Sequence, residues 1–247
     1  MSINQYVGGN FLDSGDAPEV DIAPGLRRQA LLSGKNLALC LTSFEEGGLL
    51  PQHTYPHEQA GYVIFGSLEL DVGGIRYAAE AGSAYLIRGD LGFSARAIEP
   101  SLTINGFSAA TPPPLPGESD FAFLAQAERG KQRAGAYEVV VGATSVPKNE
   151  IVSGFWRQTL IYGDDLMLVL CTFSGGGSLP EHNHHNEQAG YIISGALELN
   201  VEGQTHVARA GCSSFMHSNQ FHSARALEDS LSIDAFSPPR LEYLPEA

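Results

Sequence analysis

Histidines are concentrated in one short stretch of the chain. Six of the eight fall between residues 182 and 222, and His182, His184 and Gln188 belong to the run H-N-H-H-N-E-Q. Side chains two residues apart in a strand point to the same face. We therefore expect His182 and His184 to aim at one point, with Gln188 at the same parity. An antiparallel return of the chain would bring His222 opposite them.

Three imidazole nitrogens and one amide oxygen suit a divalent transition metal. The pattern predicts one divalent ion per chain (Fe, Mn, Co, Ni or Zn), held by His182, His184, Gln188 and His222. Because all four ligands are neutral, the dication would keep its full charge for polarising a substrate carbonyl, which favours Lewis-acid catalysis. His217 is the candidate catalytic group for proton transfer, since imidazoles titrate near neutral pH; a solvent-exposed histidine is the alternative.

The segment that carries these residues is one of two copies. PQHTYPHEQAGYVIFGSLELDVGG begins at Pro51, and PEHNHHNEQAGYIISGALELNVEG begins at Pro180, an offset of 129 residues. The offset is constant from Gln29 to Phe107 of the first copy, with no insertion. Equal loop lengths predict the same fold twice.

The first copy departs from the ligand pattern. The positions of the four candidate ligands hold His53, Tyr55, Gln59 and Phe93. One imidazole has become a phenol and another a phenyl ring. We expect a metal-free first copy in which aromatic rings fill the space of the ion.

Charged residues present in both copies are expected to be structural. Glu58 corresponds to Glu187, and Arg96 corresponds to Arg225. The first copy lacks the ligand set. A residue that is found in both copies is therefore not expected to take part in the chemistry of the second copy. A salt bridge is the expected role of Arg225.

Short strands separated by glycines dominate each copy. LALCLTSF and LMLVLCTF are apolar runs, and the segments after them alternate apolar and polar residues, which is typical of antiparallel strands. The pattern predicts an all-β sandwich or barrel in each copy. We place the domains at residues 1–115 and 116–247, with a Pro-rich exit at Thr111–Gly117 and a short helix beginning at Ser119.

The composition of the chain limits the classes of partner that it is expected to bind. The chain has 247 residues and a formal net charge of −14, with no Lys/Arg cluster. The negative electrostatic field of such a chain disfavours binding to nucleic acid and to anionic membranes. The three cysteines are expected to be reduced thiols, and no secretory signal or spanning segment is recognisable, which favours a cytoplasmic protein. The expected partner is a small-molecule substrate, with a homodimer possible.

The two histidine-containing segments resemble the cupin family. The first cupin motif, G-x5-H-x-H-x3,4-E-x6-G, is matched with Gln in place of Glu by Gly176, His182, His184, Gln188 and Gly195. In the second motif Gly211 and His222 fit, while three turn positions differ. The resemblance implies two tandem cupin barrels, each a double-stranded β-helix (jelly roll), with the metal held by the motif residues of the second.

The glutamine variant of the motif narrows the resemblance. The run H-x-H-x-x-E-Q-x-G-Y is similar to cupins that tautomerise unsaturated uronates, to polyketide cyclases and to a bicupin isomerase, and the ending IDAFSPPRLEYL looks like the last of these. The resemblance implies non-redox isomerisation or cyclisation through a metal-stabilised enolate. An Fe(II)-dependent dioxygenase on the same ligands is one alternative, and a non-catalytic cupin that binds a sugar or another metabolite is the other.

Overall fold

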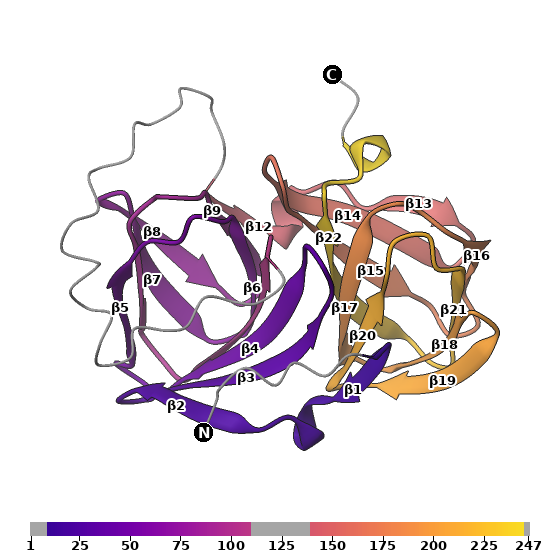
Figure 1. The fold of residues 1–247 in the computed structure, drawn as a ribbon, viewed down its shortest axis with the longest axis horizontal. Helices are drawn as coiled ribbons and strands as arrows, with labels where there is room; N and C mark the ends of the chain where they lie inside the picture. Colours follow the sequence, from indigo (N-terminus) through magenta and orange to yellow (C-terminus); the bar gives the residue numbers. More distant parts are fainter. Residues whose placement is uncertain (1–8, 110–138, 245–247) are drawn as a thin grey trace.

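The computed structural model describes residues 9–109 and 139–244, which form mainly antiparallel β-strands. Two barrels lie side by side, each built from a larger and a smaller sheet (Figure 1). This architecture confirms the predicted all-β fold with two tandem jelly-roll barrels. The domain boundary predicted near residue 115 and the helix expected after Ser119 lie outside the described residues.

The first barrel pairs a sheet of seven strands with a sheet of four. The larger sheet has the order β12 (Val140–Gly142), β9 (Ser83–Ile87), β6 (Gln59–Phe65), β11 (Ser101–Phe107), β4 (Ala38–Phe44), β3 (Leu26–Ser33) and β2 (Glu19–Ala23). The smaller sheet has the order β5 (Leu49–His53), β10 (Phe93–Ala97), β7 (Ser67–Val72) and β8 (Ile75–Glu80). Along β7, Leu68 and Leu70 are buried and Glu69 is exposed, as the twofold period of a half-buried strand requires.

The second barrel repeats this plan. Its larger sheet has the order β1 (Phe11–Asp13), β20 (Cys212–Met216), β17 (Glu187–Ser194), β22 (Ser230–Ser237), β15 (Met167–Phe173), β14 (Phe155–Tyr162) and β13 (Asn149–Val152). Its smaller sheet has the order β16 (Ser178–His182), β21 (His222–Ala226), β18 (Ala196–Val201) and β19 (Gln204–Arg209). Single 3₁₀ turns occur at η1 (Ser14–Asp16), η2 (Ala143–Ser145) and η3 (Leu241–Tyr243).

The first strand of each half is added to the barrel of the other half. β1 pairs with β20 of the second barrel, with Phe11 opposite Ser214. β12 pairs with β9 of the first barrel, with Val140 opposite Tyr85. The two pairings involve equivalent positions of the repeat, so each half gives its first strand to the barrel of the other half. Figure 1 shows the indigo β1 against the orange strands of the second barrel. Backbone ladders therefore tie the two barrels together.

An apolar core fills the space between the barrels. It contains the equivalent pairs Leu31 with Leu160 and Leu32 with Ile161, together with Phe215 of β20, and all five are buried. Burying a side chain of this size stabilises a fold by roughly 1.5–3 kcal/mol. Separate cores lie inside each barrel. The interface is thus a core shared by both halves.

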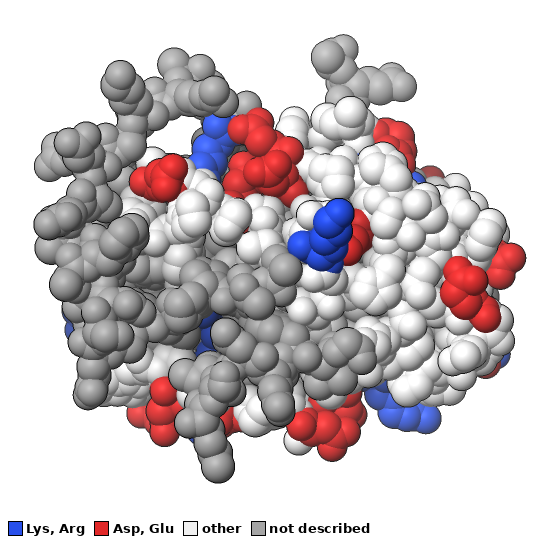
Figure 2. All heavy atoms as spheres, viewed as in Figure 1, with Lys and Arg blue, Asp and Glu red and all other residues white. Residues whose placement is uncertain are grey.

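The surface agrees with the acidic composition. On the face drawn in Figure 2, acidic side chains are spread over both barrels and the basic ones form no continuous stripe. Among the described residues, no helix has the length and hydropathy needed to cross a bilayer.

Candidate metal centre

The smaller sheet of the second barrel brings two histidines face to face. His182 is the last residue of β16 and His222 is the first residue of β21, and the two are direct partners in the antiparallel ladder. Their ring centroids lie 4.3 Å apart. Cross-strand partners share one face of a sheet. The return expected for His222 therefore places it opposite His182.

His184 reaches the pair from the turn beyond β16. Its ring centroid lies 5.8 Å from that of His182 and 5.0 Å from that of His222. One ligand atom from each ring lies within 4.8 Å of the other two. We expected His182 and His184 to share a strand, but β16 ends at His182. The turn, rather than strand parity, carries His184 into the cluster.

Backbone carbonyls determine which nitrogen of each ring carries a proton. Each Nδ1 of the cluster contacts a backbone carbonyl oxygen. The carbonyl belongs to Pro180 for His182 (2.9 Å), to Asn186 for His184 (2.8 Å) and to Gln220 for His222 (2.9 Å). A carbonyl oxygen only accepts, so each Nδ1 is the protonated nitrogen and each Nε2 presents a lone pair. This arrangement is the usual one for metal-binding histidines. Nε2 of His222 is buried and has no hydrogen-bond partner among the described residues.

Gln188 turns its amide oxygen toward the same point. Oε1 lies 3.1 Å from Nε2 of His184. Oε1 is therefore the amide atom that faces the cluster. Two lone pairs then face each other at about the distance that separates adjacent ligands of an octahedral ion, roughly 3 Å for bonds of about 2.1 Å. The donor set therefore fits a divalent cation.

Burial keeps the three rings neutral. It lowers the pKa of His184 and of His222 to about 4, and it also lowers the pKa of His182. The positive charge of Arg240 contributes to the lowered pKa of all three rings. Neutral imidazole is the form that binds a metal, so the cluster is ready to ligate at neutral pH without losing a proton.

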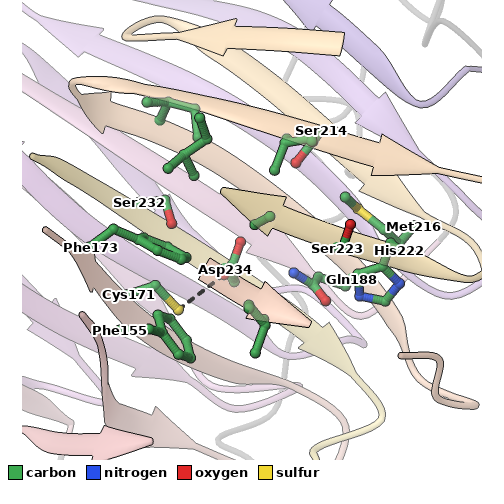
Figure 3. A pocket seen from close by; sticks show the side chains of 15 residues that line it. Phe155, Cys171, Phe173, Gln188, Ser214, Met216, His222, Ser223, Ser232 and Asp234 are labelled. Atoms are coloured by element: carbon green, nitrogen blue, oxygen red, sulfur yellow. Dashed lines mark hydrogen bonds between the residues drawn. The ribbon is translucent and has the colours of Figure 1, made fainter. Parts of the chain in front are cut away.

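A pocket lies inside the barrel beside this cluster (Figure 3). The polar side chains that line it are Gln188, Ser214, His222, Ser223, Ser232 and Asp234, and the other lining residues are mostly apolar. A small molecule in this pocket would therefore touch the cluster at His222 and Gln188.

Asp234 places a carboxyl group in the wall of the pocket. The Cys171 thiol donates to its Oδ2 (3.2 Å), as the dashed line in Figure 3 shows. A Cβ at Gly190 of the neighbouring strand would lie 2.5 Å from Oδ1, so the glycine leaves room for the carboxyl group. Burial raises the pKa of Asp234 to about 6. The group can therefore gain and lose a proton close to neutral pH.

Arg240 approaches the cluster from the tail that follows β22. Its guanidinium carbon lies 4.1 Å from the ring centroid of Tyr243 and 5.7 Å from that of Phe236. One nitrogen contacts the carboxylate of Glu242 at 2.7 Å. NH1 is buried and has no hydrogen-bond partner among the described residues. The N–H groups of NH1 are therefore unsatisfied within the described ranges.

The first barrel has aromatic rings at the equivalent place. His53 is the cross-strand partner of Phe93, as His182 is of His222. The ring of His53 lies edge-on to Tyr55 (4.7 Å) and to Phe93 (5.4 Å). Gln59 donates to Asn105, the counterpart of Asp234 (3.1 Å). The expected aromatic filling is present, and the metal-free state of this barrel stays a prediction.

His217 lies outside the three-histidine cluster. Its ring packs on Phe215 (4.9 Å between centroids), a residue of the core between the barrels. Its neighbour Met216 lines the pocket, so β20 turns alternate residues to opposite faces. The proton-transfer role of His217 stays a prediction. Arg225 forms the expected salt bridge, with Glu198 at 3.1 Å.

Sequence reasoning missed Asp234 and Arg240. Asp234 differs from its counterpart Asn105, and that difference between otherwise matching copies was the available signal. Arg240 lies beyond the repeated segment, so the first copy offers no control for it. Both residues were visible only within the ending IDAFSPPRLEYL, where no role was assigned to them.

Comparisons with known proteins bear on the same region. Residues 169–233 match the family model described as "Cupin domain". The chain is 32% identical over 100 residues to the pectin degradation protein KdgF of Dickeya dadantii (strain 3937), covering 40% of this chain and 91% of that protein. It is 34% identical over 85 residues to the H2HPP isomerase of Bacillus subtilis, covering 33% of this chain and 36% of that protein. This second match thus spans about a third of the relative's length.

Solved structures share the arrangement of both barrels. AerE from Microcystis aeruginosa superposes with a TM-score of 0.70 at 16% identity, covering 90% of this chain and 96% of that chain. The oxalate decarboxylase of Bacillus subtilis superposes with a TM-score of 0.75 at 14% identity, covering 96% and 79%, and its description names Mn(II) centres in that enzyme. At these identities the likeness concerns the fold alone.

Proposed function

Because the chain belongs to the cupin family, we propose that its second barrel is the site of a metal-dependent enzyme that isomerises or cyclises a small carbonyl compound without net redox change. The observation that carries the proposal is the convergence of three Nε2 lone pairs, each fixed by an Nδ1–H bond to a backbone carbonyl. In this proposal His182, His184, Gln188 and His222 hold one divalent cation per chain.

The neutral ligand set suits acid–base chemistry at a carbonyl group. A divalent cation bound there supplies Lewis acidity, which lowers the pKa of a C–H bond beside a carbonyl group. The residues of the chain then have two tasks, to hold the substrate and to move a proton. The name of the Bacillus subtilis relative, an isomerase, supports a non-redox reaction.

Asp234 is the candidate that moves the proton. Its carboxyl group lies in the wall of the pocket that Gln188 and His222 of the ligand set also line. A base beside the site can take a proton from one carbon and return it to another, which completes an isomerisation without an oxidant. His217 is the alternative base, and it would have to act from outside the cluster.

Arg240 is the candidate that orients the substrate. Its charge is close enough to lower the pKa of all three histidines, and its buried NH1 has no hydrogen-bond partner among the described residues. Guanidinium groups bind carboxylates through paired hydrogen bonds. We therefore assign the substrate to small carboxylic acids with an enolisable carbonyl group.

In this proposal the two halves of the chain have different roles. The unit of residues 1–115 has no metal, because Tyr55 and Phe93 replace two ligands, and the unit of residues 116–247 carries the reaction. In a bicupin of this kind the first barrel contributes structure, through the apolar core that both halves share.

Proton exchange tests the reaction class. Protein loaded with Zn(II) should be incubated under nitrogen in D₂O with a panel of 2-oxo acids and unsaturated uronates. We expect deuterium to enter at the carbon beside the carbonyl group of at least one compound, and no exchange after chelation. Oxygen uptake with Fe(II), lost when zinc replaces iron, would instead establish a dioxygenase. Binding of a panel compound without exchange or oxygen uptake would indicate a binding protein.

A further inference from the structure

The carboxylate of Glu187 leaves the second barrel and binds a turn of the first. Glu187 begins β17, and its two oxygens accept hydrogen bonds from the backbone N–H groups of Lys35 (2.8 Å) and Asn36 (2.7 Å). This turn joins β3 to β4. Consecutive backbone N–H groups form a favourable seat for an anion. Because Glu187 is buried, the contact is a fixed link between the barrels.

The turn is shaped for this approach. A Cβ at Gly34 would lie 2.7 Å from Oε1 of Glu187 and 2.5 Å from the ring of Phe215. Both distances are shorter than real Cβ contacts allow, so the carboxylate occupies space that only glycine leaves open. The turn of the first barrel thus forms a binding site that accepts the Glu187 carboxylate of the second barrel in one position.

A second link of the same kind runs in the opposite direction. Glu58, the counterpart of Glu187, accepts hydrogen bonds from the backbone N–H groups of Asp164 (2.9 Å), Asp165 (2.9 Å) and Leu166 (3.0 Å). A Cβ at Gly163, the counterpart of Gly34, would lie 2.3 Å from the oxygens of Glu58. The two links therefore lie at equivalent places and are of the same kind, with two backbone donors for Glu187 and three for Glu58. They differ in the surroundings of the glutamine that comes directly after each glutamate.

The residue after Glu187 belongs to the candidate metal centre. Strand alternation turns Gln188 into the second barrel, where it contacts His184 (3.1 Å) and lines the pocket together with Asp234. The residue after Glu58 is Gln59, which contacts Asn105 in the barrel without the ligand set. Only one of the two links is continuous with the three-histidine cluster.

We infer that Glu187 is a positioning residue: the turn at Lys35–Asn36 of the first barrel holds the start of β17 and thereby fixes Gln188 against His184. In this role the first barrel is part of the metal centre without binding metal. The inference rests on the proposed function, because it concerns the ligand set of that site.

Matched variants test the inference in the full chain. Glu187→Gln and Glu58→Gln each remove one carboxylate from an equivalent interface seat. We expect both to lower the melting temperature by similar amounts. Only Glu187→Gln should weaken Co(II) binding, by about tenfold, as loss of a group that orients a ligand does, and only it should change the visible spectrum of the Co(II) protein. Equal affinities and spectra for the two variants would overturn the inference.

A measurement on metal-free protein separates this inference from the proposed function. The ring nitrogens of His184 give signals in a ¹⁵N NMR spectrum that report its contact with Gln188. These signals should move in Glu187→Gln and stay in place in Glu58→Gln. If the parent protein binds no Co(II), the proposed function fails, while the His184 signals still decide whether Glu187 positions Gln188. Unmoved signals in both variants would refute the positioning role.

Discussion

His182 and His222 are direct cross-strand partners, and their ring centroids lie 4.3 Å apart. In the first barrel the same register pairs His53 with Phe93. One ladder position therefore holds two imidazoles in one barrel and an imidazole with a phenyl ring in the other. The difference between the barrels is local, because the backbone that presents the residues is the same.

Metal content should follow this difference. After loading with Co(II) and desalting, we expect one equivalent per chain, measured by elemental analysis. His222→Ala removes a ligand and leaves the buried rings without a third partner, so the bound metal should fall below about a tenth of an equivalent. The matched control is His53→Ala, which should keep one equivalent. Two equivalents in the parent protein would contradict a metal-free first barrel.

Asp234→Asn should stop proton transfer without emptying the site. The first barrel holds Asn105 at the equivalent position, so the amide suits this environment. Because an amide is not a base at neutral pH, deuterium exchange should slow by about 10²-fold or more, with Co(II) content unchanged.

The control for Asp234 is Cys171→Thr. The first barrel has Thr42 at that position, and a hydroxyl group keeps a donor to the carboxylate, so exchange should change less than threefold, on the order of one hydrogen bond. An Asp234→Asn variant that exchanges at the parent rate would remove Asp234 from the mechanism. Loss of exchange in His217→Gln would then identify His217 as the base.

The sequence predicted those parts of the site whose residues lie close together in the chain or are aligned by the internal repeat. His182, His184 and Gln188 lie within seven residues, and His222 returns to them through strands whose loop lengths match those of the first copy. A strand period and one antiparallel return suffice to predict their meeting. The error lay in the detail, since a turn and not β16 presents His184.

The parts that the sequence did not predict depend on long-range pairing. Asp234 meets Cys171 across β22 and β15, 63 residues apart in sequence. β1 pairs with β20 across a separation of about 200 residues, and a strand of three residues carries too little pattern to predict its partner. Arg240 approaches the cluster through a tail outside the repeat. In each case the contact arises from the packed fold and not from local periodicity.

Arg240→Met should impair substrate binding and leave metal content unchanged. A hydrogen bond to a charged group contributes about 1.5–3 kcal/mol, so KM for a carboxylate substrate should rise roughly ten- to a hundredfold. Steady-state kinetics on the compound that shows exchange measures this change.

The matched control for Arg240 is Arg225→Met. Arg225 is exposed and paired with Glu198 at 3.1 Å, so its loss should change KM by less than about twofold. A parent-like KM in Arg240→Met would show that the carboxylate binds elsewhere. Reduced metal content in that variant would show that Arg240 supports the cluster instead.

The first barrel should contribute to acid sensitivity through His53. Burial, with a smaller contribution from the charge of Arg28, lowers the pKa of this ring from 6.5 to about 4, while Nδ1–H donates to the carbonyl of Pro51. The folded state keeps His53 neutral, so its contribution is full above pH 6.5 and declines as the pH falls toward 4. Between pH 7 and 5 the loss is about 2 kcal/mol. Urea unfolding of metal-free protein should show His53→Gln losing about that much less stability than the parent over this range. Equal losses would mean that the ring is already protonated or solvated in the folded state.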